Sequence, residues 1–322
     1  MSEEAPRRTG WRSWFAPTGQ PPAWALVGYM AAGLIAGVAL SSPLPNVRGA
    51  MLGGLAGLVV AAAGSGGPSA ISRRVALITA ALGLVLTAVA FGTGGHPVWA
   101  AVAMAAVAVL TSLGAAAGPL GAVIGFLLSL AYLIVALMAR TANLFEHVSF
   151  RWGAAHIAVG CLAGLLVVLV GTAWRRRTEP EEMRAATAPP IPVRAMWESL
   201  KTFDEHARDG VRRAIPLAIL MYFFQRNGGR DAFWIFFAAY LVLLTPGKNQ
   251  KSQTAVRVGS AIFGVLLLGV ASLLFPDRAL FSFGIVILFA GIGLGPAYPV
   301  FGGGLTTIGS VLLAGAPTGA IG

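Results

Sequence analysis

Long runs of apolar residues, separated by short stretches rich in glycine, proline and charge, make up most of this chain. A helix that crosses the hydrocarbon core of a bilayer needs about 20 mostly apolar residues. The first half has six runs near this length, at roughly 24–43, 48–65, 75–93, 97–117, 119–139 and 153–174. The second half has five, at roughly 212–226, 231–246, 256–275, 279–295 and 298–314. The pattern predicts an all-α integral membrane protein.

A charged, proline-containing stretch separates the two groups of runs and divides the chain into four parts. We expect a cytoplasmic tail at 1–23, a first transmembrane bundle at 24–174, a cytoplasmic linker at 175–211 and a second transmembrane bundle at 212–322. Residues 195–213 combine spaced apolar positions with many charges, which predicts an amphipathic helix. We expect this helix to lie along the membrane surface and to lead into the second bundle.

A short element occurs twice, at Ser69–Leu86 and again 183 residues later at Ser252–Gly269. In each copy an Arg-Val pair begins five residues after the serine, and a long apolar run follows. Such repeats are typical of transporters built from two related bundles, which place the substrate site where the halves meet. The same spacing predicts a twelfth helix beyond Gly322, matching 153–174. The second bundle is therefore expected to be truncated from six helices to five, or else to take its last helix from a partner.

Composition and charge support a membrane location. Hydrophobic residues make up 57% of the chain and charged residues 11%, whereas a soluble domain has about 25% charged residues. If the N-terminus is cytoplasmic, 17 of the 23 Lys and Arg residues fall on the cytoplasmic side, as the positive-inside rule requires. We therefore expect a multi-pass protein of the bacterial inner (plasma) membrane with the N-terminus inside. The net charge of +11 does not indicate nucleic-acid binding, because the basic residues flank apolar spans.

The repeated arginines, Arg74 and Arg257, are the strongest candidates for a binding site. Each begins a spanning helix at its cytoplasmic end, and two converging guanidinium groups would bind a carboxylate through paired hydrogen bonds. Hydroxyl groups and helix N-termini nearby would add donors. The full candidate set for an anionic substrate is Arg74, Arg257, Ser69, Ser252, Thr254, Lys248 and Lys251. The competing interpretation is that the arginines only anchor the helix ends at lipid phosphates.

The apolar runs contain almost no residues suited to catalysis or metal binding. No acidic residue lies in the middle of a predicted span, so proton coupling has little support in the sequence. Cys161 is the single cysteine and no histidine pair has metal-ligand spacing, so we expect no cofactor or metal and no enzymatic activity. His156 lies inside the sixth run, where it either handles protons or is a neutral side chain hydrogen-bonded within the bundle.

Residues 233–270 resemble the FUSC family, the fusaric acid resistance and aromatic acid exporter proteins. The matching positions are Phe233, Trp234, Pro246, Lys248, Lys251, Ser252, Arg257, Val258 and Gly264. The first half carries a weaker copy, in which Ser69, Arg74 and Val75 match but Arg48 and Gly49 replace the aromatic start.

The resemblance implies two six-helix bundles that export small organic, including aromatic, acids across the inner membrane. Plant aluminium-activated malate channels look similar at this level, so a passive anion channel is an alternative. A non-transporting scaffold subunit of a membrane complex is a third. The expected partners are the lipid bilayer and an organic anion, with a homo-oligomer or a partner membrane subunit left open.

Overall fold

The computed structural model describes residues 19–141, 148–184, 193–227, 258–260, 262–264, 266–267, 270 and 277–314. All regular structure in these residues is helical, and no strand occurs among them. Four of the described helices are long and apolar enough to cross a membrane, namely Trp24–Ser41, Ser69–Thr93, Pro97–Ala116 and Phe150–Arg175. The prediction of an all-α membrane protein is therefore confirmed at this level.

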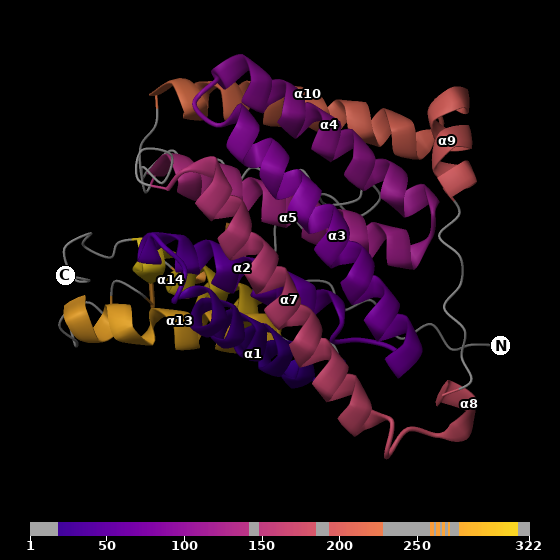
Figure 1. Ribbon diagram of the computed structural model, residues 1–322, viewed down its shortest axis with the longest axis vertical. Helices are drawn as coiled ribbons and strands as arrows, with labels where there is room; N and C mark the ends of the chain where they lie inside the picture. The colour runs from indigo at the N-terminus through magenta and orange to yellow at the C-terminus, as the bar shows by residue number, and fades with distance from the viewer. Residues whose placement is uncertain are drawn as a thin grey trace. The chain divides into compact units, whose positions relative to one another are not determined.

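Each of the six apolar runs of the first half forms a helix (Figure 1). These helices are α1 (Trp24–Ser41), α2 (Ala50–Ala63), α3 (Ser69–Thr93), α4 (Pro97–Ala116), α5 (Pro119–Thr141) and α7 (Phe150–Arg175). A short 3₁₀ helix, η2 (Val47–Gly49), precedes α2. Proline is the first residue of α4 and of α5, where its missing N–H leaves no helical hydrogen bond unmade. Gly95 and Gly118 precede these prolines with φ of +81° and +94°, values that glycine adopts without strain.

The segment that follows α7 differs from the sequence expectation. After α8 (Glu181–Arg184), the single amphipathic helix predicted at 195–213 is in fact two helices, α9 (Val193–Thr202) and α10 (Glu205–Asn227). Asp204 lies between the two helices and caps the start of α10. Its Oδ1 accepts hydrogen bonds from the backbone N–H groups of His206 (3.0 Å) and Ala207 (3.1 Å). The apolar run at 212–226 is consequently not a separate helix but the continuation of α10.

The described helices divide into two compact units, residues 28–227 and residues 19–27 with 258–314. In the smaller unit, α13 (Asp277–Leu294) packs against α14 (Pro299–Ala314) through glycines that leave no room for side chains. In the larger unit, α10 packs along α4 through a buried stripe of small and apolar residues. The stripe consists of Ala207, Gly210, Ala214, Leu217, Met221 and Phe224. Helix α10 thus belongs with the first-half helices, whereas the sequence pattern places the start of the second bundle at 212.

A glycine seam joins α1, α2 and α7 within the larger unit. Gly53 and Gly57 of α2 contact α1 on one side and α7 on the other. A Cβ atom added to a facing glycine would lie under 3.0 Å from backbone atoms of Gly53 or Gly57; these glycines are Gly33, Gly37, Gly160 and Gly164. Close backbone approach through small residues is how helices gain packing energy in lipid, where apolar burial gives little.

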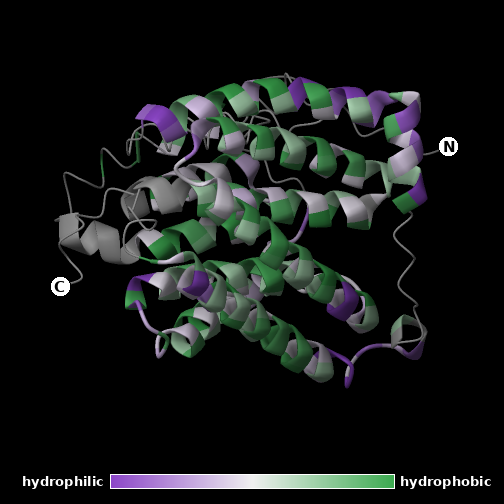
Figure 2. Ribbon diagram, turned by 45° about the horizontal axis from the view of Figure 1, so that its top comes forward, coloured by the Kyte–Doolittle hydropathy of each residue, from purple (hydrophilic) through white to green (hydrophobic). Residues whose placement is uncertain are grey.

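The outer surfaces of the long helices are apolar as well. Hydrophobic residues cover most of the length of these helices (Figure 2). Leu77 and Val85 of α3, Leu110 of α4 and Leu166 of α7 retain between 53% and 60% of their exposure. This surface matches the hydrocarbon of a bilayer, which is the environment that the sequence predicts.

Candidate functional site

Two of the seven predicted site residues lie in the part of the chain that the structure describes. Ser69 is the first residue of α3 and is buried, with 1% of its surface exposed. Arg74 lies in the second turn of the same helix and is exposed. The other five fall outside the described residues: Lys248, Lys251, Ser252, Thr254 and Arg257. The paired arrangement of Arg74 and Arg257 therefore stays a prediction.

A carboxylate of the chain itself already binds at the start of α3. The backbone N–H of Ser69 donates to Oε1 of Glu179 at 3.0 Å, and the preceding Pro68 has no side-chain group that could cap the helix. The Ser69 hydroxyl beside it is the main cause that lowers the pKa of Glu179, with smaller contributions from the Ser69 N–H, Arg175 and Arg176. The start of α3 is thus an environment that favours a carboxylate, and Glu179 occupies it.

Arg175, the last residue of α7, fixes the turn between α2 and α3. Its guanidinium group donates from Nη1 to the carbonyl oxygens of Ser65 (3.2 Å) and Gly67 (3.3 Å), and from Nη2 to the Gly64 carbonyl (3.2 Å) and the Ser72 hydroxyl (3.1 Å). The same guanidinium lies over the ring of Tyr29, 5.3 Å from its centroid. These contacts satisfy carbonyl groups at the C-terminal end of α2 that the helix itself leaves without partners.

From the sequence, Arg175 is predicted only to be one of the basic residues on the cytoplasmic side. One signal could have identified its role, namely the glycine-rich turn at 64–67. Such a turn leaves several carbonyl groups without helical partners, and a planar guanidinium with five donors suits them.

Five arginines lie in the first two turns of α3 and at the end of α7. Arg73 donates from Nε to the Ser69 carbonyl at 3.3 Å, Arg74 follows it, and Arg175, Arg176 and Arg177 come from the end of α7. We call this set of five residues the arginine end of the bundle. A concentration of positive charge beside low-dielectric helices raises the local concentration of anions.

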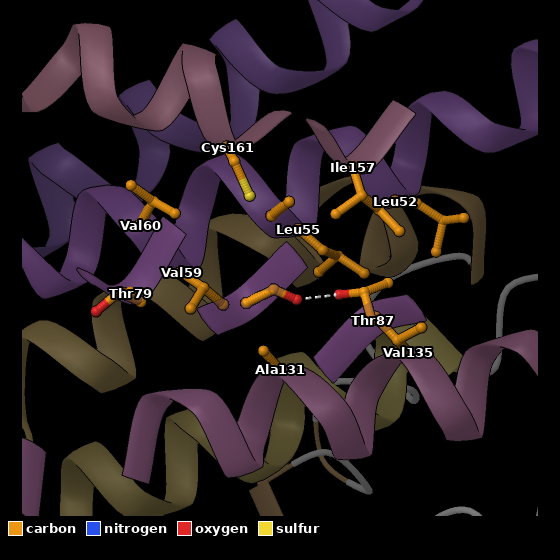
Figure 3. A pocket seen from close by; sticks show the side chains of 12 residues that line it. Leu52, Leu55, Val59, Val60, Thr79, Thr87, Ala131, Val135, Ile157 and Cys161 are labelled. Atoms are coloured by element: carbon orange, nitrogen blue, oxygen red, sulfur yellow. Dashed lines mark hydrogen bonds between the residues drawn. The ribbon is translucent and has the colours of Figure 1, made fainter. Parts of the chain in front are cut away.

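A small pocket of about 20 Å³, partly open to the outside, lies between α2, α3, α5 and α7 (Figure 3). The lining residues are Leu52, Leu55, Ala56, Val59, Val60, Thr79, Gly83, Thr87, Ala131, Val135, Ile157 and Cys161. Thr87 donates its hydroxyl to the Gly83 carbonyl at 2.7 Å, while Oγ1 of Thr79 is buried without a hydrogen-bond partner. The volume is near the minimum for one water molecule, so in this conformation it excludes an organic acid.

His156 is fully buried near the start of α7. Its Nε2 lies 2.9 Å from the carbonyl oxygen of Pro45, and because a carbonyl only accepts, Nε2 is the protonated nitrogen. The ring fits against Gly49, where an added Cβ would collide with it. This contact joins α7 to the turn after α1, so the His156 ring is hydrogen-bonded within the bundle.

Comparisons of the chain with protein-family models, with curated proteins and with solved structures find no match. The resemblance to the FUSC family is therefore still a prediction from the residues at 233–270, and the function is argued from the arrangement of the described helices.

Proposed function

We propose that this protein is a membrane transporter that exports small organic acids, including aromatic ones, across the bacterial inner membrane. The observation that carries the proposal is the arginine end of the bundle, where the start of α3 holds a carboxylate and Arg73, Arg175 and Arg176 lie close to it. In a chain with only 11% charged residues, such a concentration suits the capture of an anion. The internal repeat and the resemblance to the FUSC family support the same conclusion.

In the proposed mechanism an organic anion approaches the arginine end from the cytoplasm. Arg74 is exposed there and offers a planar fork that pairs with a carboxylate. The Ser69 N–H binds Glu179, so an incoming acid either pairs with Arg74 alone or replaces Glu179 at the start of α3. Because the pocket holds only about 20 Å³, passage requires α2, α3, α5 and α7 to separate from the closed arrangement.

Arg74→Ala is expected to lower the rate of benzoate export about tenfold in proteoliposomes that contain the full chain. Loss of one hydrogen-bonded charge pair costs about 1.5–3 kcal/mol, which corresponds to a factor of ten or more. Arg74→Lys keeps the charge but loses the planar guanidinium group that binds a carboxylate through two hydrogen bonds, so an intermediate rate is expected. The matched control is Arg226→Ala at the far end of α10, where an exposed arginine contacts only Tyr222 among the described groups. Equal rates for all three variants would contradict the role of Arg74.

The proposed topology has its own test. With the N-terminus inside, residue 184 faces the cytoplasm and residue 226 the outside. We expect Arg226→Cys, in a Cys161→Ala background, to react with an impermeant maleimide added to intact cells. Arg184→Cys in the same background is expected to react only after the cells are opened. Labelling of residue 184 from outside would reverse the orientation and place the arginine end on the wrong side for export.

A non-transporting scaffold subunit is the second candidate function. The observation that favours it is the tight interior, in which glycine backbones of α1, α2 and α7 are in contact and the pocket is about as small as one water. The flux experiment separates the candidates, because a scaffold gives no flux with any organic acid. A passive channel gives flux that follows the membrane potential and the anion gradient alone.

A further inference from the structure

Four large apolar side chains are exposed along α9 and the turn after it. Val193, Trp197, Leu200 and Phe203 keep 67%, 55%, 41% and 48% of their surface exposed. The spacing of four and three residues places the first three on one face of the helix. Ser199 points elsewhere and is buried, at 4% exposure, in the helix that packs against α4. We call the four exposed residues the α9 face.

Phe203 holds an unusual backbone conformation for such a side chain. Its φ is +50°, in the left-handed region, and the N–H of Asp204 donates to the Ser199 carbonyl at 3.2 Å. This is the hydrogen bond of a helix C-terminal motif in which the left-handed residue is usually glycine. A phenylalanine there strains the backbone. Because the ring is half exposed, its packing contributes little stabilisation to offset this strain. The conformation therefore indicates that the ring has a role outside the fold.

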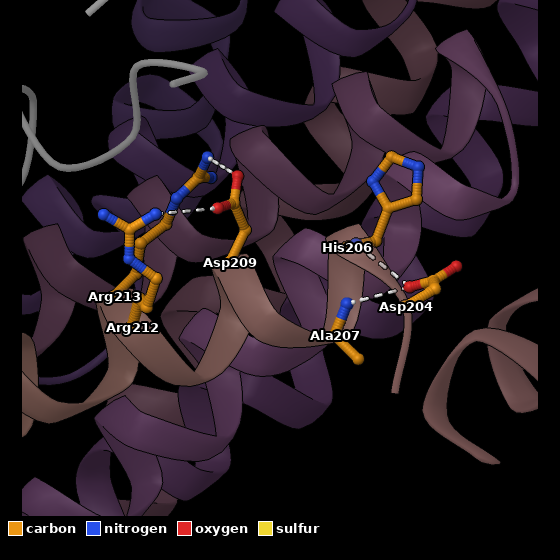
Figure 4. Close-up of polar contacts among 6 residues, drawn as sticks. All are labelled: Asp204, His206, Ala207, Asp209, Arg212 and Arg213. Atoms are coloured by element: carbon orange, nitrogen blue, oxygen red, sulfur yellow. Dashed lines mark hydrogen bonds and ion pairs between the residues drawn. The ribbon is translucent and has the colours of Figure 1, made fainter. Parts of the chain in front are cut away.

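The joint between α9 and α10 is fixed by polar contacts. Oδ1 of Asp204 accepts from the Ser199 hydroxyl (2.5 Å). It also accepts from the N–H groups of His206 and Ala207 (Figure 4). The Ser199 hydroxyl is the main cause that lowers the pKa of Asp204, so the carboxylate is charged at neutral pH. As a result α9 is held across the end of α4 and α10 instead of along them (Figure 1).

The position of α9 along the bundle follows from the packing of α10. Gly210 lies against Val109 and Ser112, a turn or two before α4 ends at Ala116. At a rise of about 1.5 Å per residue, the start of α10 is level with the end of α4. The apolar span of α4 ends there, so α9 lies at the level where the hydrocarbon of a bilayer gives way to headgroups.

We propose that the α9 face inserts into the headgroup–acyl boundary of the leaflet at this end of the bundle. Tryptophan and phenylalanine favour this boundary, and Lys201, whose Nζ lies 5.4 Å from the centre of the Trp197 ring, can extend its ammonium group to the phosphates. Residues 193–213 hold five basic and four acidic side chains, so burial of apolar surface outweighs attraction to anionic lipid. The proposal is independent of any transported substrate.

Spin labels in the full chain test this in phosphatidylcholine liposomes. Val193→Cys and Leu200→Cys, each in a Cys161→Ala background, place labels on the α9 face, and Glu198→Cys is the control on the polar side. Among the described residues the Glu198 carboxylate forms only an exposed ion pair with Arg194, so its loss is expected to leave the fold intact. We expect the ratio of collisions with oxygen to collisions with a water-soluble nickel complex to be several-fold higher at 193 and 200 than at 198. Adding phosphatidylglycerol should change it little.

Two outcomes would overturn the proposal. Labels at 193 and 200 that meet the nickel complex as often as the control would mean that the α9 face lies in water. Labels shielded from both reagents would mean that a second copy or another protein covers it. Phe203→Gly adds a further test, since it relieves the strained φ. We expect a higher melting temperature together with fewer oxygen collisions at residue 200. An unchanged collision rate would mean that Phe203 does not contribute to the membrane insertion of the α9 face.

Discussion

Replacing Gly160 by alanine is expected to destabilise the unit formed by residues 28–227 by about 2–3 kcal/mol. The added methyl group would overlap the carbonyl group and Cα of Gly53 on the facing helix. Both partners are backbone atoms of rigid helices, so no side chain can rotate away to make room. Helices α2 and α7 must therefore move apart, which weakens contacts along the whole glycine seam.

The measurement is thermal unfolding of the full chain in detergent or nanodiscs. The matched control is Gly92→Ala in α3, because an added Cβ there meets nothing within 4 Å. Alanine lowers the entropy of the unfolded chain and suits a helix better than glycine, so this control is expected to be neutral or to stabilise by up to about 1 kcal/mol. A similar loss of stability in both variants would show that the seam has no special role.

The helices of the first half were predictable because hydrophobicity and helix-breaking residues are local signals. Glycine-rich and proline-containing turns end most of the apolar runs, and the observed helices follow the predicted ranges within a few residues. The largest difference is at α3, which begins at Ser69 instead of residue 75. Its polar first turns are stabilised by Glu179 and Arg175, which lie more than 100 residues away and cannot be paired with α3 by reading the sequence.

The position of α10 could not be predicted for a related reason. Its buried stripe has helical spacing, but the charges of Arg208, Asp209 and Arg212 suggest a helix on the membrane surface. In the structure Asp209 forms ion pairs with Arg212 and Arg213, and Arg208 donates to the Phe203 carbonyl, while the stripe packs against α4. The partner of an amphipathic face is a long-range property that the pattern of one helix does not contain.

The candidate site was predictable only in its general chemistry. The repeat singles out Ser69 and Arg74 near a helix start, and in the structure the Ser69 N–H binds the chain's own Glu179, so the predicted binding of a substrate anion there stays a prediction. The sequence does not predict the role of Arg175, because a basic residue after an apolar span is expected at any cytoplasmic helix end. Its specific role depends on the shape of the turn between α2 and α3, which brings three carbonyl oxygens within reach of one guanidinium group.

Arg175→Ala is the substitution expected to affect the arginine end most. It removes four hydrogen bonds, three of them to carbonyl groups of the turn. Because the side chain is partly exposed and water replaces some of these bonds, we expect a loss of about 2 kcal/mol. Arg175→Lys is expected to recover only part of this, since one ammonium group cannot span acceptors that a planar fork reaches together.

The loss should be concentrated at the turn between α2 and α3. A cysteine at residue 66, an exposed position beside these carbonyls, reports the turn by its rate of reaction with a maleimide in a Cys161→Ala background. We expect Arg175→Ala to raise that rate several-fold. Arg176→Ala, which removes a neighbouring exposed arginine that only weakly influences Glu179, is expected to leave the rate unchanged.

If both substitutions raised the rate equally, the turn would depend on the total charge of the arginine end. A response to Arg175 alone would instead show that the hydrogen bonds of its guanidinium hold the start of α3, and with it the proposed anion site, in place.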